Sequence, residues 1–240
     1  MFLPRLLPIR TTTVTLTKFS STEAISVRLS KAKDEKKIHS LIHQDFLKNE
    51  PVTNALQMKK SHFKDFFNTL LTSKFSKDHT VVCCNQDDEV IACMIVSLYS
   101  DLGEYKQFNN IAEMETVGKK MCLDAAGNKF VALVEKSKEE LREFMPNDIH
   151  TYLRCEMASV PPEFGGNGLC YRMASEGVAL IAKKIPKLQF AFGETTNRYT
   201  LSAFKKAGFK VGSKIPYKDY DIATSVNGTD EVCGIYKKLQ

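Results

Sequence analysis

Apolar residues recur along the chain with two different periods, and the change from one to the other predicts the order of helices and strands. Helical spacing of the apolar residues between Lys33 and Leu47, and again between Leu56 and Leu71, predicts two amphipathic helices. Short runs rich in β-branched and aromatic residues, bounded by turn-forming residues, predict strands. We expect strands over residues 25–29, 80–85, 90–97, 152–160, 188–193, 210–215 and 231–237.

A long connection separates the third expected strand from the fourth. Residues 108–125 and 137–144 have helical patterns, and Gly127-Asn128 between them favours a break. Because a connection of this length rarely lacks structure of its own, we expect residues 98–151 to form a helical insertion and not a second domain. A further helix is expected over residues 168–184.

The glycine-rich turn Gly165-Gly166-Asn167-Gly168 precedes that helix. Glycine adopts positive φ and lets the backbone approach an anion closely, and the first N–H groups of a helix carry partial positive charge. The turn lacks the lysine of a Walker A loop and the spacing of a dinucleotide fingerprint. We therefore expect it to hold the pyrophosphate of another cofactor, although an ordinary loop is the alternative that the glycines alone favour.

A second helix signal follows the strand expected over residues 188–193. Asn197 is suited to the N-cap of this helix, and Gly208 to the position just after its end. The order is thus strand, glycine turn, helix, strand and capped helix.

These segments resemble two motifs of the GNAT superfamily of acyl-CoA-dependent N-acyltransferases. Residues 165–170 resemble its coenzyme A motif, with Gly165 in place of Gln or Arg and Cys170 in place of a small residue. The family's next helix motif is matched by Asn197, Thr200, Ala203, Phe204, Lys206, Gly208 and Phe209. The resemblance implies an α/β fold with a mixed, mostly antiparallel sheet of about seven strands, flanked by helices and splayed at the acetyl-CoA site.

A narrower resemblance is to the arylalkylamine N-acetyltransferases of the invertebrate dopamine-acetylating type. Residues 46–53, Phe-Leu-Lys-Asn-Glu-Pro-Val-Thr, are similar to a signature of that group, and residues 217–220 with 232–236 are similar to its closing hairpin. The resemblance covers about residues 25–240. It implies one GNAT domain and the transfer of acetyl from acetyl-CoA to the primary amine of a small arylalkylamine.

The resemblance also implies a set of coenzyme-binding residues. Two segments around the glycine turn and two residues of the next helix belong to it: Met157, Ala158, Ser159, Val160, Gly165, Gly166, Asn167, Gly168, Leu169, Cys170, Asn197 and Lys206. Main-chain groups are expected to make most of these contacts, including those of the splayed strand with the thioester.

Glu50 is the expected general base. Alkylamines have a pKa of about 10, so a base must remove a proton before attack. Glu50 matches the glutamate of the arylalkylamine signature and precedes Pro51, where a helix must end. An exposed residue at the end of a helix is the alternative.

The proton donor to the departing thiolate is less defined, because Phe204 stands where many relatives have a tyrosine. Thr196 and Thr200 match two serines proposed to assist catalysis in the arylalkylamine group, and Tyr199 is another hydroxyl between them. Helix capping is the alternative role for the two threonines.

The sequence leaves the identity of the acceptor open. Phe46, Phe63, Phe67 and Tyr217 are compatible with stacking on an aryl group, but core packing explains them equally well. A polyamine, an amino acid or a protein N-terminus is an alternative acceptor. A coenzyme A-binding protein without turnover is the alternative from another class, because Gly165 and Phe204 replace side chains often present in active relatives.

The resemblance implies acetyl-CoA and a small amine as partners, and composition bears on the partners that are not expected. The formal charge of +6 is dispersed over lysine pairs, so no nucleic-acid partner is expected, and no apolar run is long enough for a membrane span. Five histidines form no ligand constellation, so no metal is expected. We expect a monomer.

The N-terminus and the cysteines bear on the compartment. Residues 1–22 contain no Asp or Glu and are rich in Thr and Ser, so residues 1–24 are expected to be a mitochondrial transit peptide or a disordered extension. Seven cysteines without framework spacing favour reduced thiols. The expected location is the cytoplasm or the mitochondrial matrix.

Overall fold

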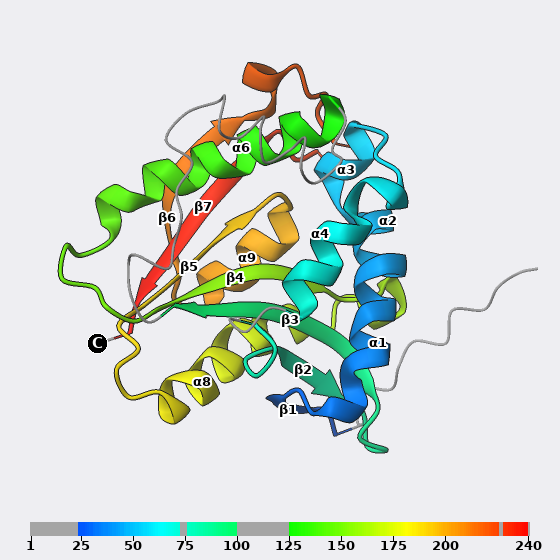
Figure 1. The fold of residues 1–240 in the computed structure, drawn as a ribbon, viewed down its shortest axis with the longest axis vertical. Coiled ribbons are helices and arrows are strands. Elements are labelled where there is room, and N and C mark those ends of the chain that lie inside the picture. Colours follow the sequence, from blue (N-terminus) through cyan, green and yellow to red (C-terminus); the bar gives the residue numbers. More distant parts are fainter. Residues whose placement is uncertain (1–23, 73–75, 100–124, 226–227, 240) are drawn as a thin grey trace, which may run out of the picture.

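A seven-stranded sheet forms the centre of the molecule in the computed structural model, which describes residues 24–72, 76–99, 125–225 and 228–239 (Figure 1). The strand order is β1-β2-β3-β4-β5-β7-β6, and every neighbouring pair is antiparallel except β4 with β5. The strands are β1 (Ser26–Leu29), β2 (Val81–Cys84), β3 (Val90–Tyr99), β4 (Tyr152–Ser159), β5 (Phe190–Thr195), β6 (Lys210–Pro216) and β7 (Glu231–Lys238). The predicted fold class and all seven predicted strands are confirmed.

One face of the sheet is covered by the N-terminal helices and by α6. The chain from η1 (Ala32–Asp34) through α1 (Glu35–Ser40), the π-helical η2 (Leu41–Phe46) and α2 (Leu47–Asn49) follows one helical course. It packs with α4 (Lys60–Thr72) on β2, β3 and β4 through a cluster that includes Ile42, Phe67 and Ile95. The amphipathic pattern predicted this packing because its apolar residues share one side.

The second predicted helix is wrong at its start. The chain forms α3 (Pro51–Ala55), breaks, and resumes helix only at Lys60. Leu56 leaves helical geometry with ψ near 0°, and Gln57 has a φ of +52°, a left-handed conformation that no helix continues through. The expected start at Leu56 therefore falls in the turn between two helices.

The long helix α6 (Ala125–Leu141), continued by η4 (Arg142–Phe144), lies across β5, β6 and β7 (Figure 1). The predicted break at Gly127-Asn128 is wrong, because both residues lie inside the first turn of α6. A first turn tolerates such residues, since its N–H groups have no intrahelical acceptor to lose. All of the helix predicted over residues 108–125 except Ala125 lies outside the described residues, and so do residues 1–23.

The opposite face of the sheet is covered by the helices after β4 and β5. These are α7 (Leu169–Arg172), the π-helical η6 (Met173–Gly177), α8 (Val178–Lys184) and α9 (Arg198–Lys206). The side chain of Asn197 accepts from the N–H of Tyr199 at 2.8 Å, and Gly208 follows α9 with a φ of +89°, so both predicted caps are confirmed. Among the described helices, none is both long and apolar enough to span a bilayer.

Candidate active site

The two central parallel strands separate before they end. Their pairing runs from Tyr152↔Phe190 to Cys155↔Gly193 and then stops. Beyond that point β4 remains paired only with β3, and β5 only with β7. The sheet is therefore open between its two middle strands on the side of their carboxyl ends.

Two local features prepare this separation. Gly193 lies so close to β4 that an added Cβ atom would be 2.8 Å from the carbonyl oxygen of Cys155, so a glycine permits the last contact between the strands. On the other edge of β4, the pairing with β3 shifts between Ile95 and Val96, which leaves Glu156 as an extra residue on β4. Such a bulge bends a strand, and here it coincides with the departure of β4 from β5.

A pocket lies where the strands part. It is lined by residues of β4 and β5, by the neighbouring strands and by α9: Met94, Cys155, Glu156, Met157, Ala158, Gly193, Glu194, Thr200, Phe204 and Ile235. The lining comes from both faces of the sheet, because Phe204 packs on the face of α7 to α9 and Met157 on the face of α1 to α4. Residues from both sides of the sheet thus contribute to the pocket.

The glycine turn lies between the 3-10 helix η5 (Pro162–Phe164), which follows β4, and the start of α7. Gly166 and Gly168 have φ values of +80° and +71°, and Gly168 is the N-cap of α7. No atom within 4 Å would touch a Cβ at either position, so glycine is required there by the backbone conformation and not by space. Residues 165–168 of the turn are exposed, and α7 begins directly after them, so the turn lies at a helix start where an anion could bind.

Most of the expected coenzyme-binding side chains have other partners. Ser159 donates to the carbonyl oxygen of Leu41 at 3.2 Å, and Asn167 donates to that of Phe164 at 3.1 Å. Leu169 is buried in the core, and burial raises the pKa of the Cys170 thiol to about 12, which keeps it neutral. What these residues offer a coenzyme is mainly their backbone.

The remaining coenzyme-binding predictions fall along β4 and α9. Ala158 and Val160 pack against the core on the face of α7 to α9. Asn197 is occupied as the cap of α9, and Lys206 is exposed at the other end of that helix. Since α7 and α9 contact each other, the glycine turn and α9 flank the same side of the opening.

Glu50 lies at the start of α3 and is only 5% exposed. Its carboxylate caps the helix by accepting from the backbone N–H groups of Val52 at 3.1 Å and Thr53 at 2.5 Å. The alternative of an exposed residue at a helix end is therefore wrong. Burial raises the pKa of Glu50, and the hydrogen bonds, chiefly the one from the Thr196 side chain, oppose this.

Thr196 and Tyr217 complete the surroundings of Glu50. Thr196 follows β5 directly, and its side chain reaches the Glu50 carboxylate. The Tyr217 hydroxyl donates to the carbonyl oxygen of Thr196 at 2.9 Å. Burial and the neighbouring charge of Glu50 raise the pKa of Tyr217, so it stays protonated. The structure thus brings together Glu50 and Thr196, which were expected from the sequence to have separate roles.

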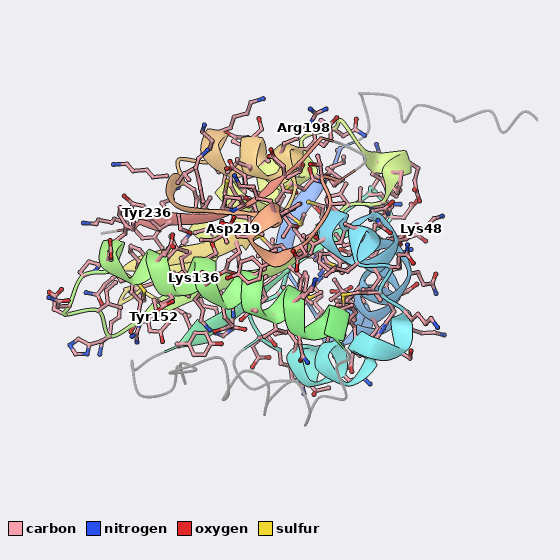
Figure 2. All side chains as sticks on the ribbon, turned by 90° about the horizontal axis from the view of Figure 1, so that it is seen from above. Lys48, Lys136, Tyr152, Arg198, Asp219 and Tyr236 are labelled. Carbon is pink, nitrogen blue, oxygen red and sulfur yellow. The ribbon has the colours of Figure 1, made fainter. Side chains whose placement is uncertain are left out.

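The helix that precedes Glu50 can be placed relative to the sheet from above. Figure 2 shows Lys48, at the end of α2, and Tyr152, the first residue of β4, on opposite sides of the molecule. Because β4 and β5 are paired at Tyr152 and part further along, α2 and α3 lie toward the open end of the sheet. Glu50 contacts the exit of β5 at that end.

The two other hydroxyl candidates have different positions. Thr200 lines the pocket from α9, together with Phe204. Tyr199 is 64% exposed, and its hydroxyl accepts from Arg198 Nη2 at 3.0 Å. Thr200 therefore faces the opening, and Tyr199 lies outside it.

Comparisons with known proteins identify the architecture. A scan of protein-family models gave no match to this chain, and a search of curated proteins gave no similar sequence. Solved structures with the same fold include arylalkylamine N-acetyltransferase 2 of Aedes aegypti, at a TM-score of 0.71 and 14% identity, covering 90% of this chain and 99% of that one. The fold is that of the GNAT N-acetyltransferases.

Two further solved structures with the GNAT fold are of differently named proteins. The polyamine N-acetyltransferase of Drosophila melanogaster, which forms N-acetylagmatine, gives a TM-score of 0.66 at 14% identity and covers 90% of this chain and 100% of that one. NAA60 of Arabidopsis thaliana in complex with acetyl-CoA gives 0.52 at 9% identity and covers 90% and 99%. The sequence resembles GNAT enzymes, and among them the arylalkylamine N-acetyltransferases. This resemblance is confirmed at the level of fold.

A buried charged group beside the opening was missed by sequence reasoning. Arg154 and Glu156 on β4 and Glu194 on β5 lie together, and Lys138 with Glu135 on α6 lies close by. Charged residues within two central strands were the available signal, since such strands are normally apolar. Among the described residues, no group of three or more His, Cys, Asp or Glu side chains could hold a metal ion.

Proposed function

We propose that the protein is an acetyl-CoA-dependent N-acetyltransferase that acts on the primary amine of a small molecule. The observation that carries this proposal is the separation of β4 from β5 beyond Cys155 and Gly193, with a pocket at the opening. A glycine turn lies on one side of this opening, and a buried carboxylate, Glu50, contacts the strand that leaves it. This arrangement supports a donor site and a base around one gap in the sheet.

Backbone groups would hold the donor. Past Cys155, the edge of β4 that faces away from β3 has lost its pairing with β5, which frees main-chain groups to bind the pantetheine arm and the thioester carbonyl. The turn and the start of α7 would take the pyrophosphate through N–H groups. Gly165 supplies no side chain here, so affinity rests on backbone geometry.

Glu50 would take the proton from the acceptor amine, directly or through a water molecule. A positioned general base contributes about 10²-fold to 10⁴-fold. Burial raises the pKa of Glu50 toward the working range of a base, while its two backbone hydrogen bonds fix its orientation.

Thr200 would assist the departing thiolate. Phe204 has no proton to donate, and Thr200 is the hydroxyl that lines the same pocket. A thiol has a pKa of about 8.5, so the thiolate needs only modest help at neutral pH. Thr196 would act through Glu50, by orienting its carboxylate.

An arylalkylamine acceptor is supported by the sequence resemblance alone. The aromatic residues considered for stacking do not line the pocket: Phe63, Phe67 and Tyr217 are buried core residues, and Phe46 packs against the same core as Phe63. A polyamine is the second candidate acceptor, and the carboxylates of Glu156 and Glu194 in the pocket favour it.

Thiol release from acetyl-CoA tests the proposal. The purified full chain is incubated with acetyl-CoA and, in turn, tryptamine, dopamine, spermidine and a peptide with a free N-terminus. Amine-dependent release that falls in Glu50→Gln but not in Glu143→Gln, an exposed glutamate of η4, is the expected result. Saturable acetyl-CoA binding without release in the presence of any of these amines would instead support the coenzyme-binding alternative.

A further inference from the structure

Glu194 has one carboxylate oxygen that the described residues leave without a hydrogen bond. Its side chain is 5% exposed. Oε2 accepts from Arg154 Nη2 at 2.9 Å and Nε at 3.3 Å, whereas Oε1 is buried and has no partner within the described part of the chain. An unsatisfied buried charged oxygen is costly, so a ligand that supplies a donor there gains the corresponding free energy.

The charges around Glu194 do not balance. Arg154 Nη1 also lies 3.3 Å from Glu156 Oε2, so one guanidinium serves two carboxylates. The neighbouring Lys138 and Glu135 form a pair of their own on α6. Counted in their ionised forms, these five side chains carry one net negative charge. Burial raises the pKa of Glu194, and a cation bound beside it would favour its ionised form.

This net negative charge faces the proposed reaction site. Glu156 and Glu194 both line the pocket between β4 and β5, and Thr200 lines it from α9. Glu194 is the first residue of β5 beyond the last pair, Cys155↔Gly193. Phe190 and Phe192 alternate with Ala191 along β5 and pack on the side of Leu141, so Glu194 extends from the α6 face of the sheet.

We propose that Glu194 binds a second, non-reacting cationic group of the acceptor, which makes the substrate a small primary amine that also carries an ammonium or guanidinium group. This inference rests on the proposed function. The reacting nitrogen must be uncharged when it attacks the thioester, so it cannot neutralise the pocket during the reaction. A second cation keeps its charge throughout and can donate to Glu194 Oε1 in every state.

A matched pair of amines tests this choice of substrate. 1,4-Diaminobutane and butylamine have the same carbon chain and differ by one ammonium group. With the wild-type full chain, we expect kcat/KM to be at least about 10-fold higher for the diamine, the discrimination typical of a charged hydrogen bond. Equal values for the two amines would overturn the inference while leaving the acetyltransferase proposal intact.

The variant Glu194→Gln tests whether Glu194 causes the preference for the diamine. We expect it to lower kcat/KM for the diamine about 10-fold to 100-fold, mainly through KM, with little change for butylamine. Glu139→Gln, an exposed glutamate on α6, is the control and should change neither. An equal loss for both amines would show a structural role for Glu194. If the variant does not fold, the wild-type amine pair alone decides.

Calorimetric titration separates this inference from the proposed function. Diaminobutane is titrated into wild type and Glu194→Gln in the presence of coenzyme A, with no turnover required. Binding that depends on Glu194 in a protein that acetylates neither amine would leave the cation site standing and reject the proposed function. Binding of equal strength in both proteins would reject the cation site.

Discussion

The side chain of Thr196 lies beside the Glu50 carboxylate and opposes the rise of its pKa, so the residue that follows β5 is next to the start of α3. Neither residue is close to the other in sequence. Their contact brings a buried carboxylate to the open end of the sheet, and the predictions below follow from this arrangement.

Replacement of Glu50 should affect catalysis more than folding. Gln retains one oxygen, which can accept from the N–H group of Thr53 or of Val52 but not from both, so α3 keeps part of its cap. It cannot accept a proton from the amine, and we expect Glu50→Gln to lower kcat/KM by about 10²-fold to 10⁴-fold. Steady-state kinetics with a thermal melt check this. A large loss of stability with unchanged activity would show that Glu50 is only a cap.

The pH profile should report the titration of Glu50. Burial raises its pKa, and only the ionised form is a base, so kcat/KM should rise with pH through this raised value. Protonation of the amine acts in the same direction, near pH 10. The limb at lower pH should therefore vanish in Glu50→Gln, while the amine limb stays. An unchanged profile would contradict the assignment.

The hydroxyl of Thr200 should contribute to turnover. We expect Thr200→Ala to reduce kcat about 10-fold, and Thr200→Ser to restore most of it, because Ser keeps the hydroxyl in the pocket. Ser202→Ala, at an exposed position of α9, is the matched control. Equal kcat for all three variants and the wild type would remove Thr200 from the mechanism.

Gly168 should be needed for coenzyme binding. Its φ of +71° is unfavourable for alanine by about 1–2 kcal/mol, so Gly168→Ala should distort the turn and weaken acetyl-CoA binding. Gly208→Ala imposes a similar strain at a φ of +89° after α9. Calorimetric titration should show weaker binding for Gly168→Ala alone, even where both variants lose similar stability. Equal affinities would mean that the turn does not hold the coenzyme.

Local patterns in the sequence predicted most of the fold. The strands and α9 follow from short apolar runs and from caps such as Asn197 and Gly208, whose effect is local. The break at Gln57 was not predictable, because nothing in its residue type demands a positive φ. The continuous start of α6 was missed because glycine and asparagine were read as a break, although they lie in a first turn.

The site was predictable only where a motif carried it. Glu50, Thr196 and Thr200 were named from family motifs, and the structure places the first two in contact and the third in the pocket. Tyr217 as a donor to Thr196 and Glu194 as a pocket carboxylate were not found. Their roles depend on strand register and on the bulge at Glu156, which join residues that no local pattern relates.

The most direct test of the account is mass spectrometry of the amine after incubation of the full chain with acetyl-CoA and a mixture of small primary amines. We expect an acetyl group on the primary nitrogen of at least one amine, formed by wild type and by Glu143→Gln, and reduced at least about 100-fold in Glu50→Gln. Coenzyme binding without any acetylated amine, or equal product from wild type and Glu50→Gln, would contradict it.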